Sequence, residues 1–271
     1  MKKIAVLGNG QLGKTYKKLY PDVHVLTSNQ VLNHPKNPND GIPLWINFYN
    51  LEPFDVIINT IAVTNTKQCE NDELSDYIGA INSSLPSYLS NYCHNRRKKF
   101  VQISTACVYK ETYAICDEAS EKAPESQYAK WKLQAELGLM RNDLILRGHL
   151  FFSDQDLPSN FLQRIRKFSS FIEESNSFTY VNDLVHASLI LLENNCFGDF
   201  NVSCDAIASP FEIAKFLNLE NISKISSEEL RKSTNLITPN IVLDNTKLSN
   251  YYTVSNLFDS INDSWKALNG I

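Results

Sequence analysis

The sequence predicts an α/β fold: a doubly wound parallel sheet followed by a smaller C-terminal lobe. Short apolar runs alternate with helical patterns along the first 149 residues, and a glycine-rich turn follows the first apolar run. Strands that alternate with helices imply right-handed crossovers, which make neighbouring strands parallel. With 271 residues, 43% of them hydrophobic, the chain is long enough to bury a sizeable core.

The elements follow in chain order. Ile4–Leu7 predicts the first strand, and residues 14–20 predict a helix that Pro21 ends. Further strands are expected at His24–Leu26, Trp45–Phe48, Phe54–Asn59, Phe100–Ser104, Leu144–Arg147, Phe200–Val202 and Asn240–Leu243, with helical patterns at 73–92, 127–139 and 184–192. We therefore expect residues 1–149 to form a nucleotide-binding domain and residues 150–271 an interleaved substrate-binding lobe.

Composition argues against several classes of protein. A net charge of −4 and a pI near 5.8 disfavour a nucleic-acid binder, and Arg96–Lys99 is the only basic run. The six cysteines lack CxxC spacing and histidines at metal-ligand intervals, so we expect reduced thiols and no metal site. No 18-residue apolar stretch occurs, and the apolar run at the N-terminus is too short for a signal peptide. A cytoplasmic protein without membrane contact is expected.

The glycine turn has the spacing of a dinucleotide-binding loop. Gly8, Gly10 and Gly13 follow a strand and open a helix. In that context the first glycine permits a tight turn, the second lets the backbone approach a pyrophosphate, and the third allows helix and strand to pack closely. Backbone N–H groups at the helix start then face the phosphates. The pattern favours a Rossmann-type cofactor domain, although a purely structural turn is the alternative.

The end of the second strand bears on which cofactor is used. An NAD-binding domain usually places an acidic residue there to bind the ribose, but the chain reads Leu26-Thr27-Ser28-Asn29. Hydroxyl and amide groups leave room for a 2′-phosphate, although no arginine is present to bind it. The sequence therefore favours NADP(H) over NAD(H).

Tyr128 and Lys132 are four residues apart, which places both on one face of a helix. A cation close to a phenol favours phenolate and lowers the phenol pKa. Alone, the spacing more often marks a solvated helix face than a catalytic pair. Thr105 ends a strand 23 residues before Tyr128, and the carboxyl ends of parallel strands are where open sheets bind ligands. A threonine that holds a carbonyl oxygen, a tyrosine that protonates it and a lysine that tunes the tyrosine suit hydride addition to a ketone.

Over nearly its whole length the sequence resembles the extended short-chain dehydrogenase/reductases, and within them the dTDP-4-dehydrorhamnose reductase group. The broad family shares the glycine and Tyr-x-x-x-Lys motifs, whereas Gly10–Gly13 and Asn59–Glu70 are similar to the reductase group in particular. Further similar stretches are Ile81–Asn82, Ile103–Tyr109, Tyr128–Glu136, Leu144–Arg147, Phe178–Asp183 and Pro239–Asp244. The resemblance implies an NAD(P)H-dependent enzyme of deoxysugar and surface polysaccharide biosynthesis that reduces the 4-keto group of a nucleotide-diphosphate 4-keto-6-deoxysugar.

The resemblance also implies roles for single residues. Thr105 would polarise the sugar carbonyl, Tyr128 would donate the proton, and Lys132 would lower the tyrosine pKa and hold the nicotinamide ribose. The cofactor would be bound by Gly8, Gly10, Gln11, Leu12, Gly13, Thr27, Ser28, Asn47, Phe48, Ala62, Val63 and Thr64, together with Tyr128 and Lys132. The substrate would be bound by Thr105, Ala106, Cys107, Asn160 and Arg164. A homodimer is compatible with the family.

Several positions depart from the reductase pattern. Ala106-Cys107 stands where that group has Asp-Tyr, Val63 where Tyr or His is common, and Thr238 where Arg is expected. The segment from Ser104 to Tyr109 is closer to nucleotide-sugar 4-epimerases. A 4-epimerase with bound NAD and a non-catalytic NADP-binding regulatory subunit therefore stay open as alternatives, while a dehydratase would carry Asp-Glu after the threonine. His149 follows the Leu144–Arg147 strand, and we expect a hydrogen-bonded loop histidine there, with substrate contact as the alternative.

Overall fold

The computed structural model describes residues 2–33, 45–111, 114–234, 237 and 239–270. Within these residues the chain forms two compact units, each assembled from separate segments. The first unit comprises residues 1–104, 126–146 and 191–199, and the second comprises residues 105–125, 147–190 and 200–271. The chain thus passes from one unit to the other several times, and the functional division at residue 149 stays a prediction.

A six-stranded sheet is the framework of the first unit. In spatial order its strands are β2 (His24–Leu26), β1 (Ile4–Leu7), β5 (Val56–Asn59), β6 (Lys99–Thr105), β8 (Leu144–Gly148) and β13 (Gly198–Asn201). The registers of β1 with β2, β1 with β5 and β5 with β6 are parallel. The chain winds in opposite directions on either side of β1, so the crevice beside the carboxyl end of β1 is the usual ligand position in such a sheet. The doubly wound Rossmann-type fold is confirmed.

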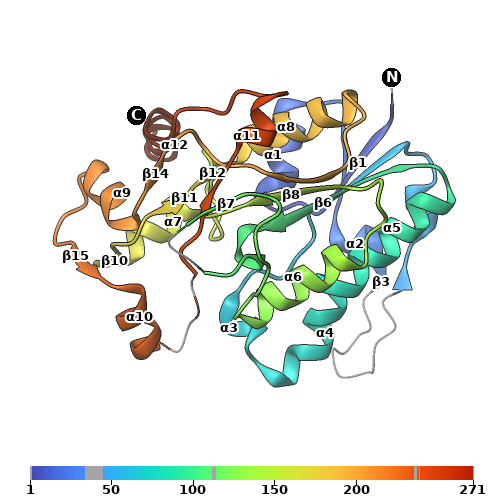
Figure 1. Ribbon diagram of the computed structural model, residues 1–271. Coiled ribbons are helices and arrows are strands. Elements are labelled where there is room, and N and C mark those ends of the chain that lie inside the picture. The colour runs from blue at the N-terminus through green and yellow to red at the C-terminus, as the bar shows by residue number, and fades with distance from the viewer. Residues whose placement is uncertain (1, 34–44, 112–113, 235–236, 238, 271) are drawn as a thin grey trace. The chain divides into compact units, whose positions relative to one another are not determined.

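Helices connect the strands. They are α1 (Gln11–Leu19), α2 (Ser28–Val31), α3 (Thr66–Cys69), α4 (Ser75–Gly79), α5 (Leu85–Asn95) and α6 (Gln127–Leu137). A π-helical turn at Ala80–Ser84 joins α4 to α5, and 3-10 turns span Phe48–Leu51 and Asp72–Leu74. Figure 1 shows α5 and α6 side by side, and the contacts between elements agree. Helix α6, which carries Tyr128 and Lys132, is therefore supported by a neighbouring helix.

The strand expected at Trp45–Phe48 is confirmed only in its first half. Only Trp45–Ile46 is extended (β4), and it pairs antiparallel with β3 (Leu32–Asn33), outside the main sheet. Phe48 already begins a 3-10 turn, and its ring stacks on Tyr92 with the centroids 4.5 Å apart. Ile46 and Phe48 are partly buried, and they line a pocket together with Tyr88 and Tyr92 of α5.

The hydrophobic core of the first unit explains why these strands form. Val56, Ile57 and Ile58 of β5 are all essentially inaccessible to solvent, as are Ala5 and Leu7 of β1. Strands covered on both faces lose the alternation of polar and apolar residues and read as continuous apolar runs. This is why the sequence pattern located the central strands well.

The second unit has no large sheet among its described residues. Its strands form two-stranded pairs: β10 (Ser170–Ile172) with β15 (Ser223–Ile225), β11 (Asn176–Ser177) with β14 (Ile207–Ala208), β12 (Thr179–Tyr180) with β9 (Phe151–Phe152), and β16 (Val242–Leu243) with β7 (Ile115–Cys116). Its helices are α7 (Phe161–Arg164), most of α8 (Val181–Glu193), α9 (Pro210–Phe216), α10 (Ser227–Thr234), α11 (Thr246–Ser249) and α12 (Leu257–Asn269), with 3-10 turns at Ala106–Val108 and Ile165–Lys167. A separate apolar cluster, which includes Phe152, Phe178 and Ile213, forms its core.

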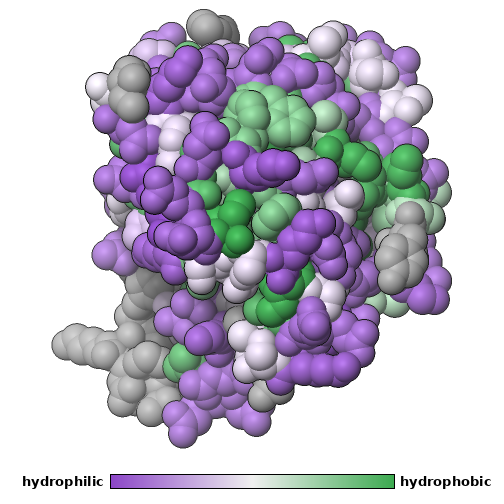
Figure 2. All heavy atoms as spheres, turned by 90° about the vertical axis from the view of Figure 1, so that its left-hand side faces the viewer, coloured by the Kyte–Doolittle hydropathy of each residue, from purple (hydrophilic) through white to green (hydrophobic). Residues whose placement is uncertain are grey.

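The face turned toward the viewer in Figure 2 shows hydrophobic side chains in small patches separated by hydrophilic ones. Among the larger apolar residues of the second unit, Phe168, Ile207 and Phe216 are exposed. No helix in the described part of the chain has the length and apolar character needed to cross a bilayer.

Candidate functional site

The glycine turn connects β1 to α1, and its three glycines differ in what surrounds them. Gly8 has a φ of +105°, a conformation that side chains rarely adopt. A Cβ on Gly13 would lie 1.9 Å from the carbonyl oxygen of Gly8, so the helix can approach the turn only with glycine there. A Cβ on Gly10 would meet no atom within 4 Å. The open space in front of Gly10 is what the backbone needs to approach a ligand, so this turn fits a dinucleotide pyrophosphate.

The end of β5 lies beside this turn. Thr60 donates hydrogen bonds to the carbonyl oxygen of Leu7 from both its backbone nitrogen (2.9 Å) and its hydroxyl (2.7 Å). Farther along, Val63 and Asn82 form a reciprocal pair: the Val63 N–H donates to Oδ1 of Asn82 and Nδ2 of Asn82 donates to the Val63 carbonyl, both at 2.9 Å. Ala62 and Val63 are half-buried and Thr64 is exposed, so this segment is fixed in place with side chains still accessible.

The polar groups at the end of β2, which were predicted to bind the cofactor, take part in the structure of α2. Thr27 is the N-cap of α2, and its side chain and backbone form a capping box with Gln30. Ser28 is the first residue of that helix. Phe48 lines an apolar pocket of about 410 Å³ together with Ile46, Tyr88, Asn91 and Tyr92. No carboxylate occurs between His24 and Val31, as the sequence indicated.

Helix α6 is fastened to the end of β6 by two buried contacts. The Lys132 ammonium donates to the Ile103 carbonyl oxygen at 2.8 Å, and the Ser104 hydroxyl donates to Oε1 of Glu136 at 2.5 Å. The start of the helix is also held, because the Ser126 side chain accepts from the Ala129 N–H and Glu70 accepts from the Gln127 N–H. The position of Tyr128, in the first turn, is set by these contacts.

Tyr128 and Lys132 differ in exposure. Tyr128 is half-buried and packs against the small apolar cluster formed by Cys69, Ile78 and Trp131. Lys132 is only 2% exposed, and burial lowers its pKa to about 8, while the nearby Glu136 acts in the opposite direction. A buried ammonium one helical turn from a partly accessible phenol is an arrangement that favours proton transfer through the phenol.

The buried charge of Lys132 has a measurable cost. Because the folded-state pKa lies below the ordinary 10.5, the unfolded chain binds more protons between pH 8 and 10.5, and stability rises with pH across that window. We expect Lys132→Met to raise the free energy of unfolding at pH 7 by about 1–3 kcal/mol, with the advantage shrinking from pH 8 to 10.5. Denaturant titrations across this pH range measure it.

Lys130→Met is the matched control, since Lys130 is exposed on the same helix and should change stability by less than about 0.5 kcal/mol. A Lys132→Met protein that is less stable than wild type at pH 7 would mean that the contact with Ile103 outweighs the cost of burial.

Thr105 ends β6 and begins the 3-10 turn that follows. Its hydroxyl accepts a hydrogen bond from the Cys107 N–H at 3.2 Å, and the residue is 4% exposed. An oxygen that already accepts from the backbone still has its proton to donate. The turn is held at its far end by Tyr109, whose hydroxyl accepts from Arg147 and donates to Oδ1 of Asn201, both at 2.8 Å. The Thr105 hydroxyl is thus held in place with its proton available for donation.

His149 is a buried, hydrogen-bonded loop residue, as expected. Its Nε2 lies 2.9 Å from Oδ1 of Asn176, and its Nδ1 lies 3.9 Å from Sγ of Cys107. Burial lowers the pKa of His149 to about 4, against the opposing effect of its hydrogen bonds to Asn176 and the Pro239 carbonyl. The imidazole is therefore neutral across the physiological pH range.

Asn160 and Arg164 occupy different environments on α7. Asn160 is fully buried, and its amide makes hydrogen bonds to the backbone of Ser153, Gln155 and Leu162, so it caps the helix and closes the preceding loop. Arg164 is exposed, and no partner for its guanidinium is found among the described residues. Of the two, Arg164 has the group available for a phosphate.

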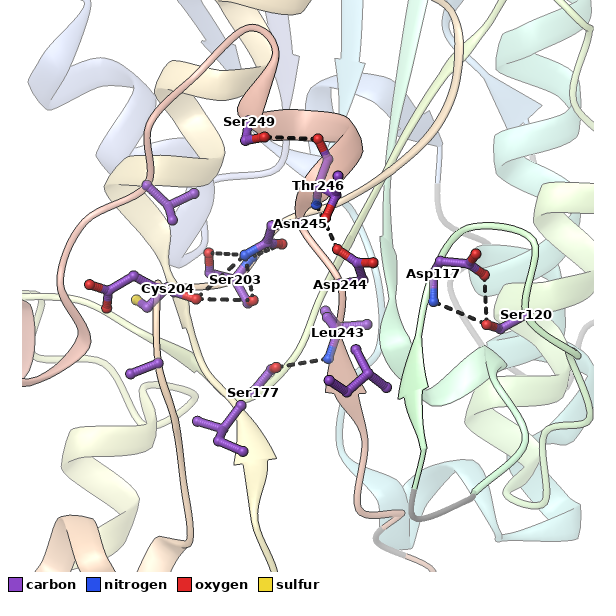
Figure 3. Close-up of a pocket in the computed structure, with 15 residues that line it drawn as sticks. Asp117, Ser120, Ser177, Ser203, Cys204, Leu243, Asp244, Asn245, Thr246 and Ser249 are labelled. Carbon is purple, nitrogen blue, oxygen red and sulfur yellow. Dashed lines mark hydrogen bonds between the residues drawn. The ribbon is translucent and has the colours of Figure 1, made fainter.

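A larger hollow, of about 660 Å³, lies elsewhere in the second unit. Figure 3 shows that polar side chains around it bond to one another: Asn245 to Ser203, Asp117 to Ser120, and Ser177 to the Leu243 N–H. None of the residues predicted to bind substrate lines it. Because its polar groups are largely satisfied within the protein, it is a weaker candidate than the residues at the strand ends.

The structure places the predicted residues in two groups. All predicted cofactor residues belong to the first unit, and Thr105, Ala106, Cys107, Asn160 and Arg164 belong to the second.

Sequence reasoning missed the supporting residues, among them Glu136, Gln102 and Asn176. Glu136 lies one turn after Lys132 on the same helix face, a signal that could have been used, whereas Asn176 has no sequence relation to His149. In the described residues no cluster of potential metal ligands occurs. Thr238 lies outside the described residues.

The family described as RmlD substrate binding domain matches residues 2–234. No curated protein sequence matches the chain.

Among solved structures, the protein is similar to a dTDP-4-dehydrorhamnose reductase from Clostridium acetobutylicum, with 23% identity and a TM-score of 0.81 over 98% of this chain and 99% of that one. It is also similar to the Bacillus anthracis dTDP-4-dehydrorhamnose reductase, which was solved with NADP, with 21% identity and a TM-score of 0.80 over 97% and 98% of the two chains. A UDP-glucuronic acid 4-epimerase from Bacillus cereus, solved with NAD, has 18% identity and a TM-score of 0.73 over 98% and 96%. At these identities the likeness establishes the fold.

Proposed function

Because the chain belongs to the RmlD substrate binding domain family, we propose that it reduces the 4-keto group of a nucleotide-diphosphate 4-keto-6-deoxysugar. A bound nicotinamide cofactor supplies the hydride in such a reaction. Tyr128 gives a proton to the developing alkoxide, and the Thr105 hydroxyl donates a hydrogen bond to the same oxygen. Lys132 favours loss of the tyrosine proton through its charge.

One observation supports this proposal more than the others: Lys132 keeps an ammonium in a buried position that costs stability. It lies one turn after Tyr128 and is anchored to the Ile103 carbonyl, the residue two before Thr105. Burying a cation costs free energy, so a buried cation indicates that its charge is needed for function. Groups with strongly shifted pKa values, as Lys132 has, concentrate at functional sites. If the helix had only a structural role, an apolar side chain at this position would make the protein more stable.

The glycine turn supports the cofactor part of the proposal. Gly10 leaves open space at the start of α1, where backbone N–H groups favour phosphate. At the end of β2 the chain lacks a carboxylate that would repel a 2′-phosphate, which favours NADP(H) over NAD(H).

The test is a spectroscopic assay. We expect oxidation of NADPH when purified protein is mixed with one member of a panel of dTDP-, UDP-, GDP- and CDP-linked 4-keto-6-deoxysugars, and slower oxidation of NADH. Two alternatives give different results. A 4-epimerase would hold NAD and convert a nucleotide sugar without net oxidation of cofactor. A regulatory subunit would bind NADP and leave every ketosugar unchanged, although the retained Thr105, Tyr128 and Lys132 disfavour this.

A second prediction concerns the nucleotide diphosphate. Arg164 is an exposed residue, and its guanidinium has no protein partner in the described structure, although nearby protein atoms bury that group enough to lower its pKa. Such a group suits a charge-assisted bond to phosphate. We expect Arg164→Ala to raise the KM for the nucleotide sugar about 10-fold with little change in kcat, since the phosphate is bound equally before and during the reaction. Lys167→Ala, which removes an exposed charge three residues away, is the control. Equal effects of the two substitutions would contradict a specific role for Arg164.

A further inference from the structure

The buried ammonium of Lys132 has a buried carboxylate one helical turn away. Glu136 follows Lys132 by four residues on α6, a spacing that places both side chains on the same face of the helix. Lys132 is 2% exposed and Glu136 is 9% exposed. Lysine and glutamate are rarely buried, because a charge loses its hydration when it leaves water. Two of them in succession on one buried face indicate that the second charge compensates the first.

The end of β6 holds both charged groups. The Lys132 ammonium donates to the Ile103 carbonyl oxygen at 2.8 Å, and the Ser104 hydroxyl donates to Oε1 of Glu136 at 2.5 Å. Consecutive residues of one strand therefore fix the two members of the pair. Neither charged group can turn toward solvent without breaking a buried hydrogen bond, which would be costly.

The charges around Lys132 act on it unequally. Burial lowers the pKa of Lys132 to about 8, and among the described residues Glu136 is the charge that opposes this effect. The π-helical turn Ala80–Ser84, which packs against α6, carries no ionisable side chain. The other ionisable residues of α6 and of the elements in contact with it are Tyr128 and Lys130 of α6, Lys99 of β6, Lys67, Cys69 and Glu70 at α3, and Tyr88, Tyr92, Cys93 and His94 of α5.

We infer that Glu136 is a positioning residue of the reaction, whose carboxylate keeps the side chain of Lys132 charged and so enables proton transfer by Tyr128 at neutral pH. The inference rests on the proposed function for the roles of Tyr128 and Lys132. Glu136 acts through Lys132 and not on the reacting atoms. Without this carboxylate, burial would favour the neutral amine, which has no charge to favour loss of the tyrosine proton.

The protonation of Lys132 can be measured directly by NMR. In protein labelled with ¹³C-lysine, the Cε signals are followed against pH, and the signal that is missing in Lys132→Met identifies Lys132. We expect Lys132 to titrate with a pKa of about 8 in wild type and about one pH unit lower or more in Glu136→Gln. Glutamine keeps an oxygen that can accept from Ser104, so the substitution removes the charge and preserves the contact. Glu73→Gln, which removes an exposed carboxylate, is the control and should leave this titration unchanged.

Kinetic measurements test the consequence for the reaction. Because Lys132 is charged only below its pKa, kcat for ketosugar reduction should fall as pH rises through that pKa. In Glu136→Gln the fall should begin at a lower pH, by about the same amount as the NMR titration moves. Glu136→Asp retains the charge, so its kcat should decline close to the wild-type pH even if the shorter side chain lowers stability. A purely structural role for Glu136 would lower the midpoint of thermal unfolding in both variants and leave the pH of the decline unchanged.

The outcomes separate this inference from the proposed function. The same Lys132 titration in wild type and Glu136→Gln overturns the inference, whether or not any ketosugar is reduced. A lower titration with an unchanged pH dependence of kcat also overturns it. If the titration moves but wild type oxidises no NADPH with any ketosugar of the panel, the reductase is wrong and the effect of Glu136 on Lys132 is supported.

A double variant keeps the test decisive if Glu136→Gln does not fold. Removal of one member of a buried ion pair leaves an uncompensated charge, whereas removal of both members does not. Folding that is restored in Glu136→Gln/Lys132→Met would show that the uncompensated ammonium unfolds the single variant, which supports the inference. A double variant that is also unfolded would make Glu136 a structural residue and overturn it.

Discussion

Replacing Tyr128 by phenylalanine should lower kcat for ketosugar reduction by about 10²–10⁴-fold. Phenylalanine keeps the ring that packs against Cys69, Ile78 and Trp131, so only the hydroxyl is lost. Without it no positioned acid remains for the alkoxide, and water must supply the proton. The loss should be in kcat rather than in KM, since the phenol acts on charge that develops only in the transition state. Stopped-flow measurement of NADPH oxidation under single-turnover conditions would isolate the chemical step.

Tyr77→Phe is the matched control for this prediction. Tyr77 packs against the same apolar cluster, and its substitution removes a hydroxyl without changing the ring. It should leave kcat within a few-fold of wild type. NADPH titration by fluorescence should show that both variants still bind the cofactor. If Tyr128→Phe retains full activity, the proton comes from another group and the proposed mechanism is wrong.

The first unit could be predicted well from the sequence because its signals are local. Ile4–Leu7 and Val56–Asn59 are buried on both sides of a parallel sheet, so each appears as an uninterrupted apolar run. The glycine spacing and the four-residue spacing of Tyr128 and Lys132 likewise depend on neighbours in sequence. At Trp45–Phe48 the predicted strand was only partly right, because Phe48 begins a 3-10 turn and stacks on Tyr92 of α5. Apolar character alone does not specify which element a residue contacts.

The second unit could not be predicted in the same way, since its organisation depends on contacts between distant residues. Its strands are two or three residues long and pair across large separations, as β7 does with β16. Such strands carry no periodic pattern to detect. The contact of His149 with Asn176 has the same character: each residue alone is an ordinary polar group, and only the fold brings them together.

Gly13→Ala should lower stability, whereas Gly10→Ala should weaken NADPH binding without lowering stability. The two substitutions together therefore test the cofactor site. At Gly13 the new Cβ would lie 1.9 Å from the carbonyl oxygen of Gly8, so the backbone must move. We expect destabilisation by about 1–3 kcal/mol or more, seen as a lower midpoint of thermal unfolding. At Gly10 the Cβ meets no protein atom and φ is −81°, which any residue adopts, so stability should change by less than about 0.5 kcal/mol.

The Gly10→Ala protein should nevertheless bind NADPH at least 10-fold more weakly, since the methyl group occupies the space that a pyrophosphate needs near the start of α1. Isothermal titration with NADPH, paired with thermal unfolding of the same samples, separates loss of fold from loss of binding. A Gly10→Ala protein that is stable and binds NADPH as wild type does would place the pyrophosphate away from this turn. The glycine pattern would then reflect only the packing of α1 on β1, for which Gly13 alone is sufficient.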